Sequence, residues 1–185
     1  MLIRLTCGQL KQIYRFCGGA MDKRHDMPEL RFIRLEVSKG RATAYALDRC
    51  RAAKLVVTPE GQKGTGTIFL PLLPVPKAAK ECVVSADGKE IHVNFDDGMS
   101  YCVQEPEGAF PKPDALDKAF RPHEKATFSI WFNPRLLAEA LKAVQVGKNG
   151  KVRLDFFSPT APVVLCPEVT PGSLLVLPLR PPEGE

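Results

Sequence analysis

The chain has 185 residues, 44% of them hydrophobic and 25% charged, which is enough apolar material for one large domain or two small ones. Its net charge of +5 suits weak contact with a polyanion, but many ordinary proteins share that charge. The six cysteines form no CxxC pair and no apolar run approaches the roughly 20 residues of a membrane span, so we expect reduced thiols, a cytoplasmic location and no membrane partner.

Three stretches, residues 2–16, 67–81 and 129–144, each read as a strand running into a short helix and are each followed by strand-like sequence. Leu10, Leu73 and Leu136 align them at a spacing of 63 residues (73 − 10 and 136 − 73). Asp87-Gly88 and Asp97-Gly98 are strong hairpin signals after the second stretch. The pattern predicts an α+β protein of three βαβββ units, with short helices on antiparallel sheets. The alternative is chance spacing in a chain rich in leucine and proline.

A proline-rich segment, Phe110 to Pro122, separates the second unit from the third. Because proline fixes φ and disfavours helix at the preceding residue, the segment is predicted to be an extended connector. We therefore expect one domain of two units at residues 1–120 and a single unit at residues 121–185.

Four motifs in this order resemble the bacterial sliding clamp, the beta subunit of DNA polymerase III. They are "ATAYALDRCRAAKLVV", "EGAFPKP", "FNPRLLAEALKAV" and the closing "LVLPLR". The resemblance implies a DNA-clamp-like fold, with residues 1–120 similar to the middle clamp domain and residues 121–185 similar to the second half of the last domain. The family has four units in those two domains, whereas this chain has three.

In sliding clamps the closing strand and a neighbouring loop line a shallow apolar pocket, where polymerases and other replication or repair proteins insert a short peptide with Leu and Phe. The residues that match it are Asp48, Arg51, Pro111, Val176, Leu177, Pro178, Leu179 and Arg180. The alternative for Leu174 to Leu179 is a plain core strand, and because alternate side chains point opposite ways, both interpretations can hold.

The resemblance also implies contact with duplex DNA through phosphate groups, without base readout. The cations expected on the inward helices or close to them are Lys11, Arg15, Lys23, Arg24, Lys77, Lys80, Arg135 and Lys142. Lys11 and Arg15 are spaced i, i+4, as on one helix face. The alternative is that these residues form ordinary solvated helix faces.

Catalysis is not expected, and neither is a metal or another cofactor. His25, His92 and His123 show no metal-ligand spacing with cysteine or with each other. Asp96 and Asp97 precede Gly98, which indicates a hairpin turn rather than a catalytic carboxylate pair. We expect a binding protein, not an enzyme.

Assembly follows from the count of units, because two units cover each other's apolar faces and the third is left with an open face and strand edges. We expect a homo-oligomer, with a dimer through the third unit favoured and a tetrameric ring as the alternative. The alternative function is a non-ring adaptor or decoy that binds clamp-interacting partners without loading onto DNA.

Overall fold

The computed structural model describes the whole chain except residues 23–26, 49, 121–127, 146–149, 170–171 and 181–185. The chain divides into two compact units, Met1–Phe120 (unit 1) and Arg121–Glu185 (unit 2), and each is described by itself. None of the helices in the described ranges has the length and apolar character needed to cross a membrane.

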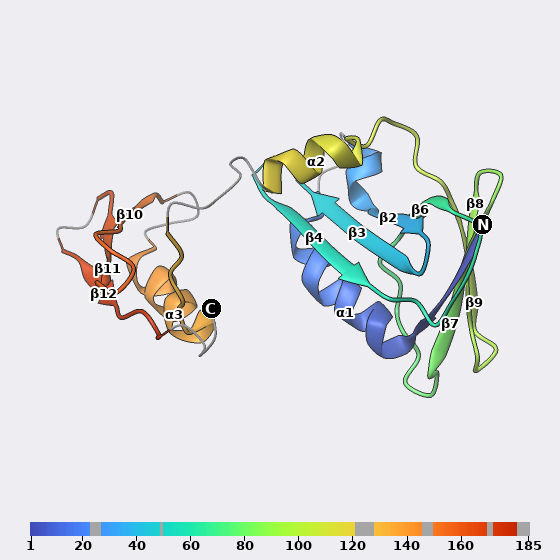
Figure 1. The fold of residues 1–185 in the computed structure, drawn as a ribbon, viewed down its shortest axis with the longest axis horizontal. Coiled ribbons are helices and arrows are strands. Elements are labelled where there is room, and N and C mark those ends of the chain that lie inside the picture. Colours follow the sequence, from blue (N-terminus) through green and yellow to red (C-terminus); the bar gives the residue numbers. More distant parts are fainter. Residues whose placement is uncertain (23–26, 49, 121–127, 146–149, 170–171, 181–185) are drawn as a thin grey trace. The chain divides into compact units, whose positions relative to one another are not determined.

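The elements follow the chain in the order shown in Figure 1. Unit 1 contains β1 (Leu2–Thr6), α1 (Cys7–Cys17), the 3-10 helices η1 (Gly18–Ala20) and η2 (Pro28–Arg31), β2 (Ile33–Ser38), β3 (Arg41–Leu47), β4 (Ala52–Val57), β5 (Gly61–Lys63), β6 (Gly66–Leu70), β7 (Glu81–Asp87), β8 (Glu90–Phe95), β9 (Ser100–Gln104) and α2 (Pro113–Phe120). Unit 2 contains α3 (Pro134–Val144), β10 (Val152–Asp155), β11 (Val163–Pro167) and β12 (Leu174–Val176). The predicted α+β class, with short helices and antiparallel sheets, is confirmed.

The two halves of unit 1 exchange their first strands. One sheet has the order β5-β1-β7-β8-β9 and the other has the order β4-β3-β2-β6. Thus β1, which leads into α1, pairs antiparallel with β7 of the second half, and β6 of the second half pairs antiparallel with β2 of the first. Neither sheet is complete without a strand from the other half, so the halves interlock.

Alternation along the strands builds one core shared by both sheets. Ile3 and Leu5 of β1 are fully buried, and so are Leu35 of β2 and Val84 of β7. The side chains between them face outward, as expected for strands with a period of two residues. The exchanged strands therefore place their apolar faces in the same core as the strands they join.

Helix α1 begins where its sequence specifies. The Thr6 hydroxyl accepts a hydrogen bond from the Gln9 amide at 3.0 Å, and the Gln9 side chain accepts one from the Thr6 amide at 2.9 Å. This capping box satisfies two N–H groups at the helix start. Leu10, Ile13 and Cys17 then face the core at helical spacing.

The helix predicted for the second βαβββ repeat is absent, because residues 71–80 of unit 1 have no regular secondary structure. Three prolines in this segment, Pro71, Pro74 and Pro76, each lack the N–H that a helix requires. The expectation of a helix there was wrong. The 63-residue spacing is also not kept at helix α3. Its N-cap, Asn133, lies 127 residues after Thr6, the N-cap of α1 (133 − 6), which is one more than two repeats of 63.

The predicted extended connector was also wrong, because Pro113–Phe120 forms helix α2. Proline is tolerated at the first position of a helix, where its missing N–H has no intrahelical partner to lose. Leu116 packs in a small core with Tyr45 and Phe110. The Tyr45 hydroxyl donates to Asp117 Oδ1 at 2.9 Å, and Lys54 Nζ lies 2.7 Å from the same oxygen, so the helix is tied to β3 and β4.

The described residues of unit 2 form one helix and one sheet. Helix α3 is capped by the Asn133 side chain, which accepts from the Arg135 and Leu136 amides. It packs on a three-stranded antiparallel sheet of order β10-β11-β12. The buried core is small and consists of Ala140, Val144, Val163, Leu165 and Val176.

Replacing Tyr45 by phenylalanine tests the docking of α2. Burial, together with the hydrogen bond to Asp117, raises the pKa of Tyr45 to about 12, so the hydroxyl stays protonated and donates at neutral pH. Tyr45→Phe should lower the free energy of unfolding by about 1 kcal/mol in urea titrations. The matched control is Tyr101→Phe, which removes only an exposed hydrogen bond to Met99 Sδ and should be neutral. Equal effects of the two substitutions would contradict the docking role.

Candidate functional site

The closing segment of unit 2 continues from β12 through Leu177, Pro178, Leu179 and Arg180. Val176 is buried in the core of unit 2, whereas Leu177 is exposed and Leu179 is 51% exposed. The Leu179 amide donates a 2.7 Å hydrogen bond to the Trp131 carbonyl oxygen, so the closing segment runs antiparallel to the residues that lead into α3. Large apolar side chains are thereby held at the surface by an ordered backbone.

A hollow of about 580 Å³ lies beside this backbone pairing. Its walls are Ser129, Trp131, Pro159, Thr160, Pro178, Leu179 and Arg180. Trp131 is 42% exposed and gives the hollow a broad aromatic wall, while Arg180, Ser129 and Thr160 supply polar atoms at its walls. Apolar walls with a few polar groups are typical of sites that bind small ligands or short peptides.

A second apolar groove of about 460 Å³ lies between α3 and β12. It is lined by Leu136, Glu139, Ala140, Ala143, Leu174, Leu175, Val176 and Leu177. The residues expected in one pocket thus separate within unit 2. Pro178, Leu179 and Arg180 line the hollow, and Val176 and Leu177 line the groove.

The other three pocket residues, Asp48, Arg51 and Pro111, belong to unit 1. Asp48 Oδ1 accepts hydrogen bonds from the Cys50 and Arg51 amides, both at 2.8 Å. Its Oδ2 accepts from Arg51 Nε at 3.0 Å and from Nη2 at 2.8 Å. These bonds, first the one from the Cys50 amide and then the one from Arg51, hold the pKa of Asp48 below its usual range. Arg51 is therefore fixed by a two-pronged ion pair at the end of the β3–β4 hairpin.

Pro111 lies just before α2. Its carbonyl oxygen accepts a hydrogen bond from Arg34 Nη1 at 3.2 Å, and the guanidinium of Arg34 lies 5.7 Å from the ring centre of Phe110. Phe110 also packs against Phe69 at 6.0 Å between ring centres. The backbone of Pro111 is thus anchored to the sheet, and a single pocket that joins it to the closing segment stays a prediction.

The expected DNA-contacting cations are exposed wherever the structure describes them. Lys11 and Arg15 lie on the solvent face of α1. The exposed Lys77 and Lys80 lie on the irregular segment 71–80 and not on a helix, so their predicted placement was wrong. Lys142 of α3 is exposed, and Arg135 forms an i, i+4 ion pair with Glu139 at 3.2 Å. Lys23 and Arg24 fall outside the described residues.

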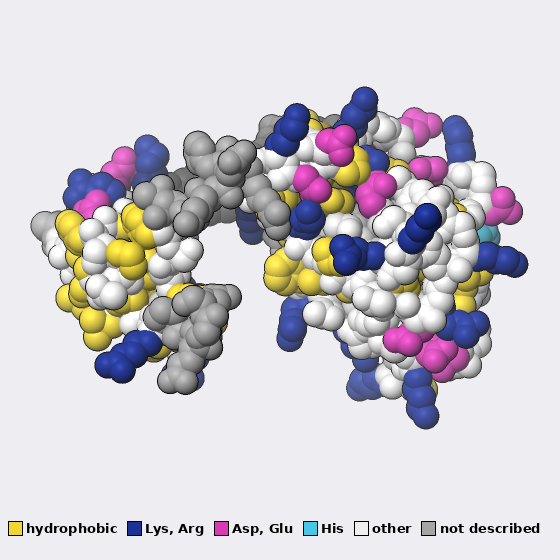
Figure 2. All heavy atoms as spheres, in the orientation of Figure 1, with side chains coloured by type: hydrophobic (Ala, Val, Ile, Leu, Met, Phe, Trp, Pro, Cys, Tyr) yellow, Lys and Arg dark blue, Asp and Glu magenta, His cyan; other side chains and the backbone are white. Residues whose placement is uncertain are grey.

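Figure 2 shows basic side chains spread over this face of unit 1, with acidic ones among them. This dispersed arrangement suits loose, sequence-independent contact with phosphates better than a tightly built anion site.

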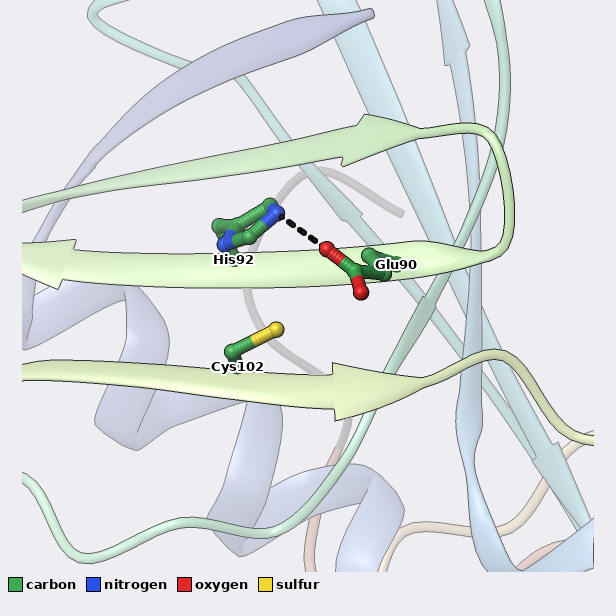
Figure 3. A group of neighbouring side chains, drawn as sticks. All are labelled: Glu90, His92 and Cys102. Carbon is green, nitrogen blue, oxygen red and sulfur yellow. Dashed lines mark ion pairs between the residues drawn. The ribbon is translucent and has the colours of Figure 1, made fainter.

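Glu90, His92 and Cys102 form the group of side chains best suited to hold a metal ion within the described ranges. They project from β8 and β9, with one possible ligand atom each within 4.8 Å of the others (Figure 3). His92 and Cys102 are directly paired across the two strands, a proximity that sequence spacing did not reveal. His92 Nε2 lies 3.3 Å from Glu90 Oε2, and Gln104 Nε2 donates to Glu90 Oε1, so the group is also satisfied as an ordinary exposed cross-strand cluster.

Sequence reasoning missed four residues of the hollow, Ser129, Trp131, Pro159 and Thr160. Trp131 is the single tryptophan of the chain and lies in an otherwise strand-like stretch directly before a capped helix. A half-exposed tryptophan in that position is a signal for binding, because tryptophan is enriched at binding hot spots. Pro159 and Thr160 carry no comparable signal.

The fold places this chain in the class of α+β DNA-clamp-like folds. Solved structures of bacterial sliding clamps are similar to it. The sliding clamp of Bacillus subtilis aligns with a TM-score of 0.74 and 14% identity over 96% of this chain and 49% of that one. The beta subunit of Streptococcus pyogenes DNA polymerase aligns with a TM-score of 0.75 and 18% identity over 97% and 50%. The Helicobacter pylori clamp bound to a DNA ligase peptide aligns with a TM-score of 0.56 and 14% identity over 89% and 47%.

This chain therefore has the fold of bacterial DNA polymerase III beta subunits and spans about half the length of the clamps it matches. No protein-family model and no curated protein matches the sequence.

Removing the Asp48 carboxylate tests the loop that holds Arg51. Because the pKa of Asp48 is lowered in the fold, its stabilising effect is present above the unfolded value near 3.9 and is lost as pH falls through the lowered folded value. Asp48→Ala should reduce the free energy of unfolding by about 1 kcal/mol at pH 7 and by much less at pH 2, as measured by urea titration. The exposed carboxylate of Glu107 provides the control, and Glu107→Ala should change neither value. A decrease of the same size at both pH values would contradict the ion-pair origin.

Proposed function

We propose that this protein is a clamp-like binding module of DNA replication or repair. Unit 1 corresponds to the middle clamp domain, and unit 2 corresponds to the second half of the last domain. The module captures a short peptide of a DNA polymerase or another clamp-binding protein, with leucine and phenylalanine side chains as anchors. It acts by binding and not by catalysis.

The hollow beside the closing segment is the observation that carries this proposal. Trp131 and Leu179 form an apolar wall on an ordered backbone, and Arg180 stands at its edge to orient a peptide carbonyl or carboxylate. A buried leucine or phenylalanine side chain contributes about 1.5–3 kcal/mol, so two anchors supply about 3–6 kcal/mol of the roughly 8 kcal/mol that micromolar binding requires. Contacts between the peptide backbone and the polar atoms of the hollow must supply the rest and offset the cost of ordering the peptide. The Helicobacter pylori clamp that carries a DNA ligase peptide has the same fold and supports this assignment.

Trp131 makes the peptide proposal directly measurable, because no other tryptophan contributes to the fluorescence of the chain. Titration with a peptide that contains Leu and Phe should shift the emission of Trp131, with a Kd in the micromolar range. Leu179→Asp should weaken binding at least tenfold, since it places a charge against the peptide's apolar anchor.

Met99→Asp is the matched control, because Met99 has a similar exposure to Leu179 but lies in the β8–β9 turn of unit 1. It should bind like the parent chain. Undiminished binding by a folded Leu179→Asp variant would remove the hollow from the proposal.

The second part of the proposed function is sequence-independent contact with duplex DNA through the exposed cations, foremost Lys11 and Arg15 on α1. An arrangement that relies on phosphate contacts alone gives weak binding that falls steeply with salt.

Charge reversal on α1 tests this contact. Lys11→Glu with Arg15→Glu should weaken binding to a short DNA duplex and reduce the salt slope by about two, one for each phosphate that is no longer neutralised, as measured by fluorescence anisotropy. The control reverses Lys39 and Arg41, two exposed cations at the β2–β3 turn, and so changes the net charge equally. An equal weakening in both variants would show that only net charge matters.

The alternative function, an adaptor or decoy that binds clamp partners without loading onto DNA, is favoured by one observation. Every wall of the hollow lies within unit 2, so peptide capture needs no ring. Micromolar peptide binding by a chain that shows no affinity for duplex DNA at low salt would select the adaptor over the processivity factor.

A further inference from the structure

Unit 2 exposes more large hydrophobic side chains than unit 1. Of the fifteen large hydrophobic side chains that are exposed among the described residues, ten lie in unit 2, although it is the smaller unit. They include Phe128, Trp131, Leu154, Phe156 and Phe157. Exposed apolar side chains in such number mark a surface that is covered by a partner.

Unit 1 shows what covers the corresponding surface in a complete domain, because the helix cap and strand pairings of unit 2 match those of its first half. The helix caps Thr6 and Asn133 correspond, which places Ser129–Phe132 at the position of β1. The hydrogen bond from the Leu179 amide to the Trp131 carbonyl, 2.7 Å, repeats the one from the Glu60 amide to the Arg4 carbonyl, 2.9 Å. Glu60 and Leu179 each follow the end of their strand, β4 or β12, by three residues.

The strand pairings extend the match to β10. Val57 of β4 pairs with Ala42, and Leu35 of β2 pairs with Ala44. In unit 2, Val176 pairs with Val163, and Leu154 pairs with Leu165. Leu154 thus takes the place of Leu35, and Phe156 takes the place of Val37.

Burial differs sharply at these matched positions. Leu35 and Val37 are 0% and 3% exposed in unit 1, whereas Leu154 and Phe156 are 38% and 48% exposed. In unit 1 the neighbour that completes this edge is β6 of the other half, with Ile68 opposite Leu35 and Gly66 opposite Val37. In the described part of unit 2, β10 has a strand on one edge only.

The segment Ser129–Phe132 has the complementary open edge. In unit 1, Met1 and Ala86 exchange backbone hydrogen bonds of 3.0 Å between β1 and β7, so by alternation the backbones of Ile3 and Leu5 also face β7. Their matches are Ile130 and Phe132. Trp131 is bonded to Leu179 on the opposite edge, as Arg4 is bonded to Glu60.

We propose that two copies of this chain complete each other by strand exchange through unit 2. Residues 129–132 of each copy pair antiparallel with β10 of the other, in the register that β6 adopts on β2. The result is two four-stranded sheets that enclose one shared core, much as the interlocked five-stranded and four-stranded sheets of unit 1 do.

A second copy fits because the register sets apolar side chains opposite one another on the core-facing side of the two strands. Ile130 faces the partner's Leu154, as Ile68 faces Leu35 in unit 1. Phe132 faces the partner's Val152, as Leu70 faces Ile33. Phe128 faces the partner's Phe156, as Gly66 faces Val37. An isologous contact satisfies both open edges of both copies at once, and no edge is left to propagate. The inference rests on the proposed correspondence of unit 2 to half of a clamp domain but not on peptide or DNA binding, which are tested separately.

The mass of the full chain in solution gives the first test. Light scattering at tens of micromolar should give twice the chain's 20.4 kDa. Phe156→Asp should halve that mass while the circular dichroism spectrum keeps its strand signal. The control is Val56→Asp on β4 of unit 1, which should stay dimeric. Val56 and Phe156 are both 48% exposed. A parent chain that is monomeric, or a folded Phe156→Asp variant that remains dimeric, would overturn the proposal.

A disulfide across the proposed strand pair tests the register itself. Ser129 and Asp155 match Leu2 and Ser85 of unit 1, which face each other as a non-hydrogen-bonded pair. In such a pair the Cα atoms lie about 4.5 Å apart, which is close enough for a disulfide. Ser129→Cys with Asp155→Cys should form a covalent dimer on oxidation. The experiment uses a Cys166→Ser background, because Cys166 Sγ lies 3.8 Å from Asp155 Oδ2.

The control for the register moves one cysteine by two residues, combining Ser129→Cys with Arg153→Cys in the same background. It should cross-link much more slowly, because diagonal positions are about 7–8 Å apart. Equal rates for the two pairs, or no covalent dimer from the first, would overturn the exchange.

Discussion

The fold of unit 1 depends on the exchange of a first strand between two half-domains. A three-stranded sheet with one helix leaves an open edge and half of an apolar core, and neither can be covered from within the half. In unit 1, β1 and β6 cross to the opposite sheets and bury Ile3, Leu5, Ile68 and Leu70 almost completely. In the described part of unit 2, the same build comprises one sheet and one helix, and Leu154 and Phe156 lie at the surface. This open edge and exposed apolar face are what the proposed partner strand would cover.

The hollow follows from the same construction. The closing segment continues beyond β12 to the segment Ser129–Phe132 that precedes α3, and the two meet at the Leu179–Trp131 hydrogen bond. That pairing uses the edge of Trp131 that faces away from the proposed exchange. Strand exchange and peptide capture would therefore use opposite edges of one short segment, and both can occur in the same molecule.

Local signals predict the parts of the fold that local contacts decide. Helix α1 follows from the sequence because the Thr6–Gln9 capping box and the helical spacing of Leu10, Ile13 and Cys17 are local signals. Leucine spacing also favours a helix at residues 71–80, but three prolines in that segment prevent one. Helix α2 escapes prediction because Pro113 is a first helical residue and not a breaker. The resemblance points to Asp48, Arg51 and Pro178–Arg180, but Trp131 and Thr160 join the hollow only through pairing between distant segments, which spacing does not reveal.

Hydrogen exchange at the backbone amides of Ile130 and Phe132 tests the strand exchange most directly. If β10 of a second copy covers them, both amides should be protected to a similar degree as those of Ile3 and Leu5, and protection should fall on dilution as the dimer dissociates. Exchange of Ile130 and Phe132 at the rate of unpaired amides, at a concentration where Ile3 and Leu5 are protected, would contradict it.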